Sequence, residues 1–190
     1  MPSSIYVEID PGAIGDGSSR LNITTNNLEV IGGAQIGLSM AGAGESGNLN
    51  VTAQSITLNG GTPFGPSSIF AAVLPVRVAV GQAGDLTTTT DSLEILNGAQ
   101  MIASSLGVGD AGNINLTAKD LKIIGFNPGG PSNIISSSET PVSGQGGNIN
   151  INTERLLGAD GGQISTSTKS FTGSAGDLVI NASESVELRG

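Results

Sequence analysis

The chain has 190 residues with 16 acidic and 7 basic side chains, a net charge of −9, no histidine and no cysteine. A negative surface repels phosphate backbones, which argues against nucleic acid as a partner. Without histidine or cysteine the chain lacks the commonest general base, a thiolate nucleophile and a cysteine-based metal site or disulfide. We therefore expect no catalytic residues, no metal site and no cofactor, and a function other than catalysis.

A long repeat runs through the chain in three copies. Pro2-Ser3-Ser4-Ile5-Tyr6 returns as Pro66-Ser67-Ser68-Ile69-Phe70 and as Pro131-Ser132-Asn133-Ile134-Ile135, at steps of 64 and 65 residues. These starts define supra-repeats at about residues 2–65, 66–130 and 131–190. A fixed period indicates units that bury their apolar faces against their neighbours. We expect one continuous segment over residues 1–190.

Each supra-repeat contains two shorter copies, which begin with a polar turn followed by alternating apolar residues. The copies start at residues 20, 48, 85, 113, 148 and 177, at steps of 28, 37, 28, 35 and 29 residues. Alternation over four to six residues predicts a strand with one buried face. A second apolar pair follows, such as Leu28 and Val30, and then a third apolar segment. Three short strands per coil are therefore expected.

Stacking of such coils predicts an all-β fold, a right-handed single-stranded parallel β-helix (solenoid) of about six to seven coils. Two inward columns are expected: Leu21, Leu49, Leu86, Ile114, Ile149, Leu178, and Ile23, Val51, Thr88, Leu116, Ile151, Ile180. Residues 41–47 are glycine-rich and predict a loop. Disorder is disfavoured, because disordered chains lack regular apolar columns. A β-sandwich or a solenoid of another cross-section remains open.

Glycine precedes five of the anchors, at Gly47, Gly84, Gly112, Gly147 and Gly176. We expect a sharp corner there that needs a positive φ or close backbone approach. The anchor position itself alternates between Asp and Asn, as in Asp85 and Asn113. This exchange favours a turn role through side-chain bonds to the backbone rather than catalysis.

The candidate site residues are outward-facing polar side chains beside the first strand. They are expected to stack into two ladders: Asn22, Thr24, Asn50, Thr52, Thr87, Thr89, Asn115, Thr117, Asn150 and Asn152. The plain interpretation is that Asn and Thr ladders stabilise stacking and keep the face hydrated. The sharper interpretation is a regular polar surface that binds sugars. Ice binding is disfavoured, because one pair alone has the Thr-x-Thr form.

The enzyme alternative rests on acidic pairs, because glycoside hydrolysis needs two carboxylates about 5 to 10 Å apart. The nearest pairs along the sequence are Glu184 with Glu187 and Asp85 with Asp91. Calcium-binding nonapeptide repeats of the Gly-Gly-x-Gly-x-Asp form do not occur. These signals are weak, and a carbohydrate-active β-helix enzyme or a carbohydrate-binding module stays as the alternative.

Three phrases resemble the repeats of filamentous-haemagglutinin-type exoproteins, most of all cyanobacterial examples. They are residues 97–104, 111–118 and 182–190, and the resemblance covers nearly the whole chain. It implies a right-handed parallel β-helix passenger, exported by two-partner secretion through an outer-membrane transporter. Proteins of this type act as adhesins, toxin-carrying stalks or surface filaments. Their repeats contain no catalytic motif that could be carried over to residues of this chain.

We therefore expect a rod-like, non-catalytic segment of a secreted or cell-surface bacterial exoprotein, serving as an adhesin or spacer. Glycans or cell-surface receptors are the expected ligands. A self-associating structural filament, joined end to end, is a third hypothesis. The ends carry no cap pattern, which suggests a fragment of a longer array. The longest apolar run, residues 69–80, contains Pro75 and Arg77 and is too short for a transmembrane segment. No signal peptide precedes the repeats, so export is inferred for a parent protein.

Overall fold

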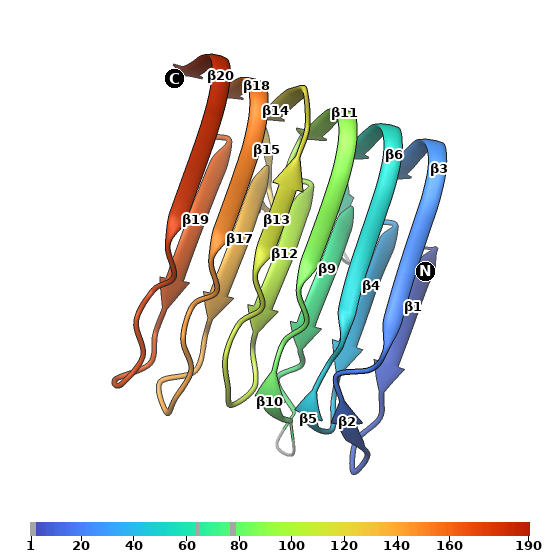
Figure 1. Cartoon of the computed structure of the whole chain (residues 1–190), viewed down its shortest axis with the longest axis vertical. Helices are drawn as coiled ribbons and strands as arrows, with labels where there is room; N and C mark the ends of the chain where they lie inside the picture. Colours follow the sequence, from blue (N-terminus) through green and yellow to red (C-terminus); the bar gives the residue numbers. More distant parts are fainter. Residues whose placement is uncertain (1–2, 64, 77–78) are drawn as a thin grey trace.

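The computed structural model describes residues 3–63, 65–76 and 79–190, so Pro2 and Arg77 of the sequence patterns lie outside the described residues. The described residues form strands and turns, with no helix among them. Figure 1 shows the strands stacked as parallel rungs, with the two chain ends at opposite ends of the stack. The chain is a parallel β-solenoid of about six turns, which confirms the predicted fold.

One wall of the solenoid is a sheet of six-residue strands, which we call the short-strand sheet. Its strands pair in parallel and in the order in which the coils follow along the chain. They are β1 (Ser4–Ile9), β4 (Gln35–Met40), β9 (Ser68–Val73), β12 (Gln100–Ser105), β17 (Asn133–Ser138) and β19 (Gln163–Thr168). These are the predicted third strands of the coils. The segments that start each long repeat form β1, β9 and β17, which is every second strand of this sheet.

The opposite wall, the long-strand sheet, holds the anchor segments. Its strands are β3 (Arg20–Ile31), β6 (Asn48–Asn59), β11 (Leu86–Leu96), β13 (Ile114–Thr117), β14 (Asp120–Ile124), β18 (Ile149–Ala159) and β20 (Leu178–Arg189). The first and second predicted strands are therefore one continuous strand in five coils and separate only as β13 and β14. The polar residues between the apolar pairs stay extended because they also pair in register, as Asn27 does with Ser55.

A third, narrow sheet lies at one corner in the first three coils. It consists of β2 (Ile14–Asp16), β5 (Ala43–Glu45) and β10 (Val80–Gln82), with β5 in the middle. The expectation of a loop over residues 41–47 is therefore wrong for Ala43–Glu45. Gly44 has a φ of +99°, and a Cβ atom there would lie 2.2 Å from the carbonyl oxygen of Gly15. Glycine content signals close packing of coils at this position rather than a loose connection.

Long and short coils differ at the opposite corner. The long coils carry antiparallel hairpins, β7 (Gly61–Thr62) with β8 (Gly65–Pro66) and β15 (Phe126–Asn127) with β16 (Gly130–Pro131). Two of the short coils close instead with tight turns in which Asn97 and Asp160 adopt φ values of 53° and 50°. Asn and Asp tolerate this left-handed region better than other side chains do. The hairpin supplies five of the extra residues of each long coil, and the rest of the difference in step length lies at the other corner.

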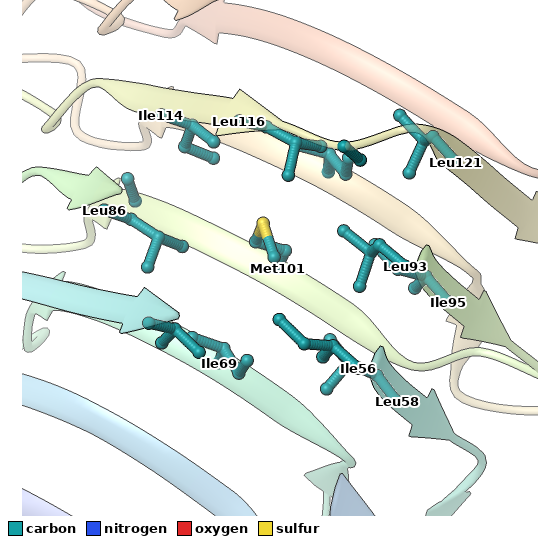
Figure 2. Packing of buried hydrophobic residues seen from close by; sticks show 14 of the residues in the cluster. Ile56, Leu58, Ile69, Leu86, Leu93, Ile95, Met101, Ile114, Leu116 and Leu121 are labelled. Atoms are coloured by element: carbon teal, nitrogen blue, oxygen red, sulfur yellow. The ribbon is translucent and has the colours of Figure 1, made fainter. Parts of the chain in front are cut away.

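Both predicted inward columns are confirmed, because their members are register partners from β3 to β20. Four central members of the first column are fully buried: Leu49, Leu86, Ile114 and Ile149. Figure 2 shows Leu86, Ile114 and Leu116 in the cluster with Met101 and Ile69 of the facing wall. Burying one such side chain contributes roughly 1.5–3 kcal/mol. The columns thus form one continuous core between the two walls.

Glycine columns form the corner that links the walls. A Cβ atom on Gly84 would lie 1.6 Å from the carbonyl oxygen of Gly47, and one on Gly112 would lie 2.0 Å from that of Gly84. The sequence predicted either close backbone approach or a positive φ at these glycines. Close approach is confirmed, and of the five glycines Gly47 alone also has a positive φ. A second column, which the sequence analysis missed, runs through all six coils: Gly15, Gly44, Gly81, Gly109, Gly144 and Gly173.

Candidate functional site

The ten candidate ladder residues lie in register on the outer face of the long-strand sheet. Asn22, Asn50, Thr87, Asn115 and Asn150 form one column, and Thr24, Thr52, Thr89, Thr117 and Asn152 form the other. The structure therefore brings together all the residues that were selected from the sequence. In the last coil the columns end in Val179 and Asn181.

Side-chain amides of the ladder bond to one another along the solenoid axis. The Nδ2 atom of Asn50 donates to Oδ1 of Asn22 at 2.8 Å, and the Nδ2 atom of Asn150 donates to Oδ1 of Asn115 at 3.1 Å. These bonds link neighbouring coils and leave part of each amide free to bind water or a ligand. The geometry matches the predicted stabilising role, and the second column, with exposed Thr52, Thr89 and Thr117, remains open to solvent.

Ion pairs occupy the same outer face in the later coils. Lys119 bonds Asp91 at 2.8 Å, Lys122 bonds Glu94 at 2.9 Å, and Arg155 lies 2.6 Å from Asp120. The hydrogen bonds from Arg155 hold the pKa of Asp120 below its usual value. Each pair joins adjacent coils, so these charges link one coil to the next.

The Asp and Asn anchors form a ladder of their own at the glycine corner. The Oδ1 atom of Asp85 accepts the backbone N–H of Asn113 at 2.8 Å, and Oδ1 of Asn113 accepts that of Asn148 at 2.9 Å. The backbone N–H of Asp177 donates in turn to Oδ1 of Asn148 at 2.7 Å. Asp and Asn supply the same oxygen at this place, which explains their exchange between coils. The predicted side-chain bonds to the backbone are confirmed, but they reach the next coil rather than close a local turn.

The two acidic pairs considered for catalysis are engaged in separate structural bonds. Glu184 accepts from Arg155 at 2.6 Å, and Glu187 accepts from Arg189 at 2.7 Å. Asp85 and Asp91 bond Asn113 and Lys119, in the arrangements given above. No group of three acidic side chains able to hold a metal ion occurs within residues 3–63, 65–76 and 79–190.

A groove that the sequence analysis did not find crosses the outer face of the short-strand sheet. It has a volume of about 560 Å³ and is lined mainly by residues of β9, β12 and β17 and by residues next to these strands, together with Gln35 of β4 and Lys169 after β19. Its floor is a column of small side chains, Ala72, Ser104 and Ser137, which are 6, 4 and 3 % exposed although they point outward. Larger side chains stand on both sides of this floor.

One side of the groove is the column of Phe70, Ile102 and Ile135, two residues before the floor in each strand. The ring of Phe70 lies over Gly37, where a Cβ atom would come within 2.6 Å of the ring carbons. The other side is formed by Leu74 and Leu106, each of which donates its backbone N–H to a carbonyl of the preceding coil. The groove therefore follows the solenoid axis rather than the strands.

Glu139 and Lys169 close one end of the groove as an ion pair. The hydrogen bond from Lys169 lowers the pKa of Glu139 below its usual value. At the other end, Tyr6, Glu8 and Ser39 line a smaller cavity of about 220 Å³, which also includes Phe70. The hollow surface thus extends across most of the short-strand sheet.

Sequence alternation gave no sign of this groove, because Ala72, Ser104 and Ser137 are small side chains of the kind found at any solvent-facing strand position. The available signal was their register with taller neighbours two residues away on each side. The described part of the chain has no helix with the length and apolarity that crossing a membrane requires. Comparison with family models, curated proteins and solved structures finds no match to this chain.

Proposed function

We propose that the chain is a rod-like segment of a secreted or cell-surface bacterial exoprotein, which acts as a spacer and as an adhesive surface. The observation that carries this proposal is the parallel pairing of both walls from coil to coil through six coils, with one shift of register where β18 pairs with β20. The resemblance to filamentous-haemagglutinin-type repeats supports it, and with it export of the parent protein through an outer-membrane transporter.

Length and stiffness follow from the stack. Adjacent strands lie about 4.8 Å apart, so six coils span roughly 30 Å. Bending the rod would break backbone ladders in both walls, together with the amide and Asp/Asn ladders between coils. A net charge of −9 favours solubility of such an extended surface. Identical contacts repeated along the rod would add by multivalency when they meet a repetitive ligand.

The spacer role is tested by removing one supra-repeat, residues 66–130, which joins residue 65 to Pro131 in place of Pro66. Because Ser68 and Asn133 are equivalent register positions, the coils on either side should stack directly. We expect a folded four-coil protein whose maximum dimension in small-angle scattering falls by about 10 Å, the rise of two coils. A deletion of residues 66–84 is the control: it removes β9, and with it the return path from the end of β6 to the start of the parallel strand β11, so this variant should unfold. Loss of structure in both deletions would contradict a modular rod.

The adhesive role is tested by applying the labelled protein to a glycan array and to whole bacterial and host-type cells. We expect saturable binding that a defined sugar competes away. Binding by the variant with Asn115 and Asn150 replaced by alanine tests whether the ladder contributes to adhesion. Thr57→Ala, on the same outer face, is the control. A well-folded protein that binds no surface would reduce the role of these coils to a spacer.

A further inference from the structure

The groove on the short-strand sheet has a repeat of its own. Each of the three coils that hold β9, β12 and β17 contributes one residue to the floor and one to each side, so equivalent contacts recur at the coil spacing of about 4.8 Å. A ligand that uses several coils must present similar groups at similar intervals. An extended peptide repeats same-face side chains at about 6.8 Å, twice the rise per residue, and falls out of step with the coils. One unit of a β-linked pyranose chain is close to the coil spacing.

The lining of the groove combines a column of apolar side chains with hydroxyl and carboxamide groups. Phe70, Ile102 and Ile135 offer an aromatic and aliphatic side against which the apolar face of a pyranose ring can pack. The floor offers the hydroxyls of Ser104 and Ser137, which bond each other at 3.0 Å and keep capacity for a further bond. The carboxamides of Gln35 and Gln100 stand at the edge, and neither bonds another described residue in the structure.

Charge selects among linear polysaccharides. Among the described residues, the charged side chains that line the groove are Glu139 and Lys169, and these two neutralise each other as an ion pair. The surrounding protein carries a net charge of −9 and repels anionic chains. A cationic chain would find no unpaired carboxylate in the groove itself, because Glu8 lines the adjoining smaller cavity. The charges around the groove therefore favour an uncharged ligand.

We propose that this groove binds a linear, uncharged β-linked polysaccharide that lies parallel to the solenoid axis. The sugar rings rest on Phe70, Ile102 and Ile135, and their hydroxyls bond Gln100 and the serine floor. This assignment rests on the adhesive part of the proposed function and names its ligand class. The spacer role is independent of it and is tested separately by scattering.

The test is isothermal titration of the purified 190-residue chain with cellohexaose, mannohexaose and xylohexaose. Polygalacturonate and an extended serine- and valine-rich peptide serve as the anionic and peptide arms. We expect saturable binding of at least one neutral hexasaccharide. Gln100→Ala, which removes a side chain without a protein partner, should weaken binding about tenfold, the effect of one or two hydrogen bonds. Ser104→Leu should abolish binding by filling the floor, and Thr57→Ala on the other wall should leave it unchanged.

Circular dichroism and the melting temperature establish that each variant is folded. Because Ser104 is buried, Gln100→Ala keeps the test decisive if Ser104→Leu fails to fold. No binding of any neutral hexasaccharide by the folded chain would overturn the proposal. So would stronger binding of polygalacturonate or of the peptide, or equal loss of binding in Thr57→Ala. In each of these cases a shortened rod after deletion of residues 66–130 would still support the spacer role.

Discussion

The two walls of the solenoid use the same repeat in opposite ways. On the long-strand sheet the outer face is occupied by its own bonds, because amides and ion pairs connect one coil to the next. On the short-strand sheet the outer face is hollow, because small residues lie between taller columns. One wall thus carries most of the side-chain bonds between coils, and the other carries the groove.

The inner faces differ as well. Inward positions of the long-strand sheet are aliphatic in almost every coil, with Thr88 as an exception between Val51 and Leu116. Inward positions of the short-strand sheet change along the chain from Leu38 and Ala71 to Ser136. The hydroxyl of Ser136 donates to the carbonyl of Gly112 and accepts the N–H of Gly147. The short-strand wall is therefore tied to the glycine corner by polar bonds.

The largest expected effect comes from the corner that both walls share. Gly84→Ala places a methyl group 1.6 Å from the backbone oxygen of Gly47, which forces the coils apart. We expect a loss of at least about 3 kcal/mol in the free energy of unfolding, measured by urea denaturation. Gly32→Ala is the control, since its Cβ meets nothing within 4 Å and its φ of +64° costs only about 1–2 kcal/mol. Equal losses in the two variants would show that close stacking is unimportant.

The next effect concerns the short-strand wall. Ser136→Ala removes two hydrogen bonds and leaves a buried carbonyl and a buried N–H without this partner. We expect a loss of about 2–3 kcal/mol by chemical denaturation. Ser105→Ala removes one bond, to the carbonyl of Gly107, and should cost about half as much. The idea that polar bonds tie this wall to the corner fails if Ser136→Ala proves the milder change.

A stabilising change is expected on the long-strand wall. The Oγ1 atom of Thr88 is buried and has no hydrogen-bond partner among the described residues. Thr88→Val replaces it with a methyl group of similar shape and should raise stability by about 1 kcal/mol. Thr90→Val is the matched control, because its hydroxyl bonds the carbonyls of Gln54 and Ser92, and this variant should lose stability. A loss of stability in both variants would mean that Thr88 is satisfied in solution.

The smallest effect is the pH dependence of the ion pairs on the outer face. Arg155 lowers the pKa of Asp120, so this interaction stabilises the fold above the ordinary carboxyl pKa of about 3.9 and is lost as pH falls through the lower folded value. The stability difference between the native chain and Asp120→Asn should therefore be present at pH 6 and shrink below pH 4. It should also shrink in about 1 M salt, because both groups are partly exposed. A difference that persists at pH 2 would exclude this origin.

Much of the fold could be predicted because the inward columns have an unambiguous chemical signature. Leu49, Leu86 and Ile114 recur at the same place in each copy, and register follows when one face must be buried. Strand boundaries were harder, because nothing in the residues around Asn27 signals whether the chain bends or continues. The second glycine column was visible as Gly-x-x-Gly in five coils, from Gly44 to Gly176, but glycine favours loops and close packing equally.

The candidate surfaces divide in the same way. The ladder could be predicted residue by residue, because outward positions are set by alternation with the buried ones. The groove could not, since its depth depends on the heights of neighbouring columns on different coils, as with Ala72 between Phe70 and Leu74. Alternation in the sequence predicts whether a side chain points inward or outward. It does not predict the depth of a groove whose walls come from several coils.

The hairpins on alternate coils have a further consequence for engineering. Their tips, near Pro63 and Gly129, are exposed and belong to equivalent long coils on one edge of the solenoid. Two coil steps separate them, which amounts to about 10 Å along the axis. Exposed loop tips tolerate insertions better than paired strands do. Peptides grafted at these tips would be displayed in a row of fixed spacing, so the chain could serve as a molecular ruler for pairs of epitopes.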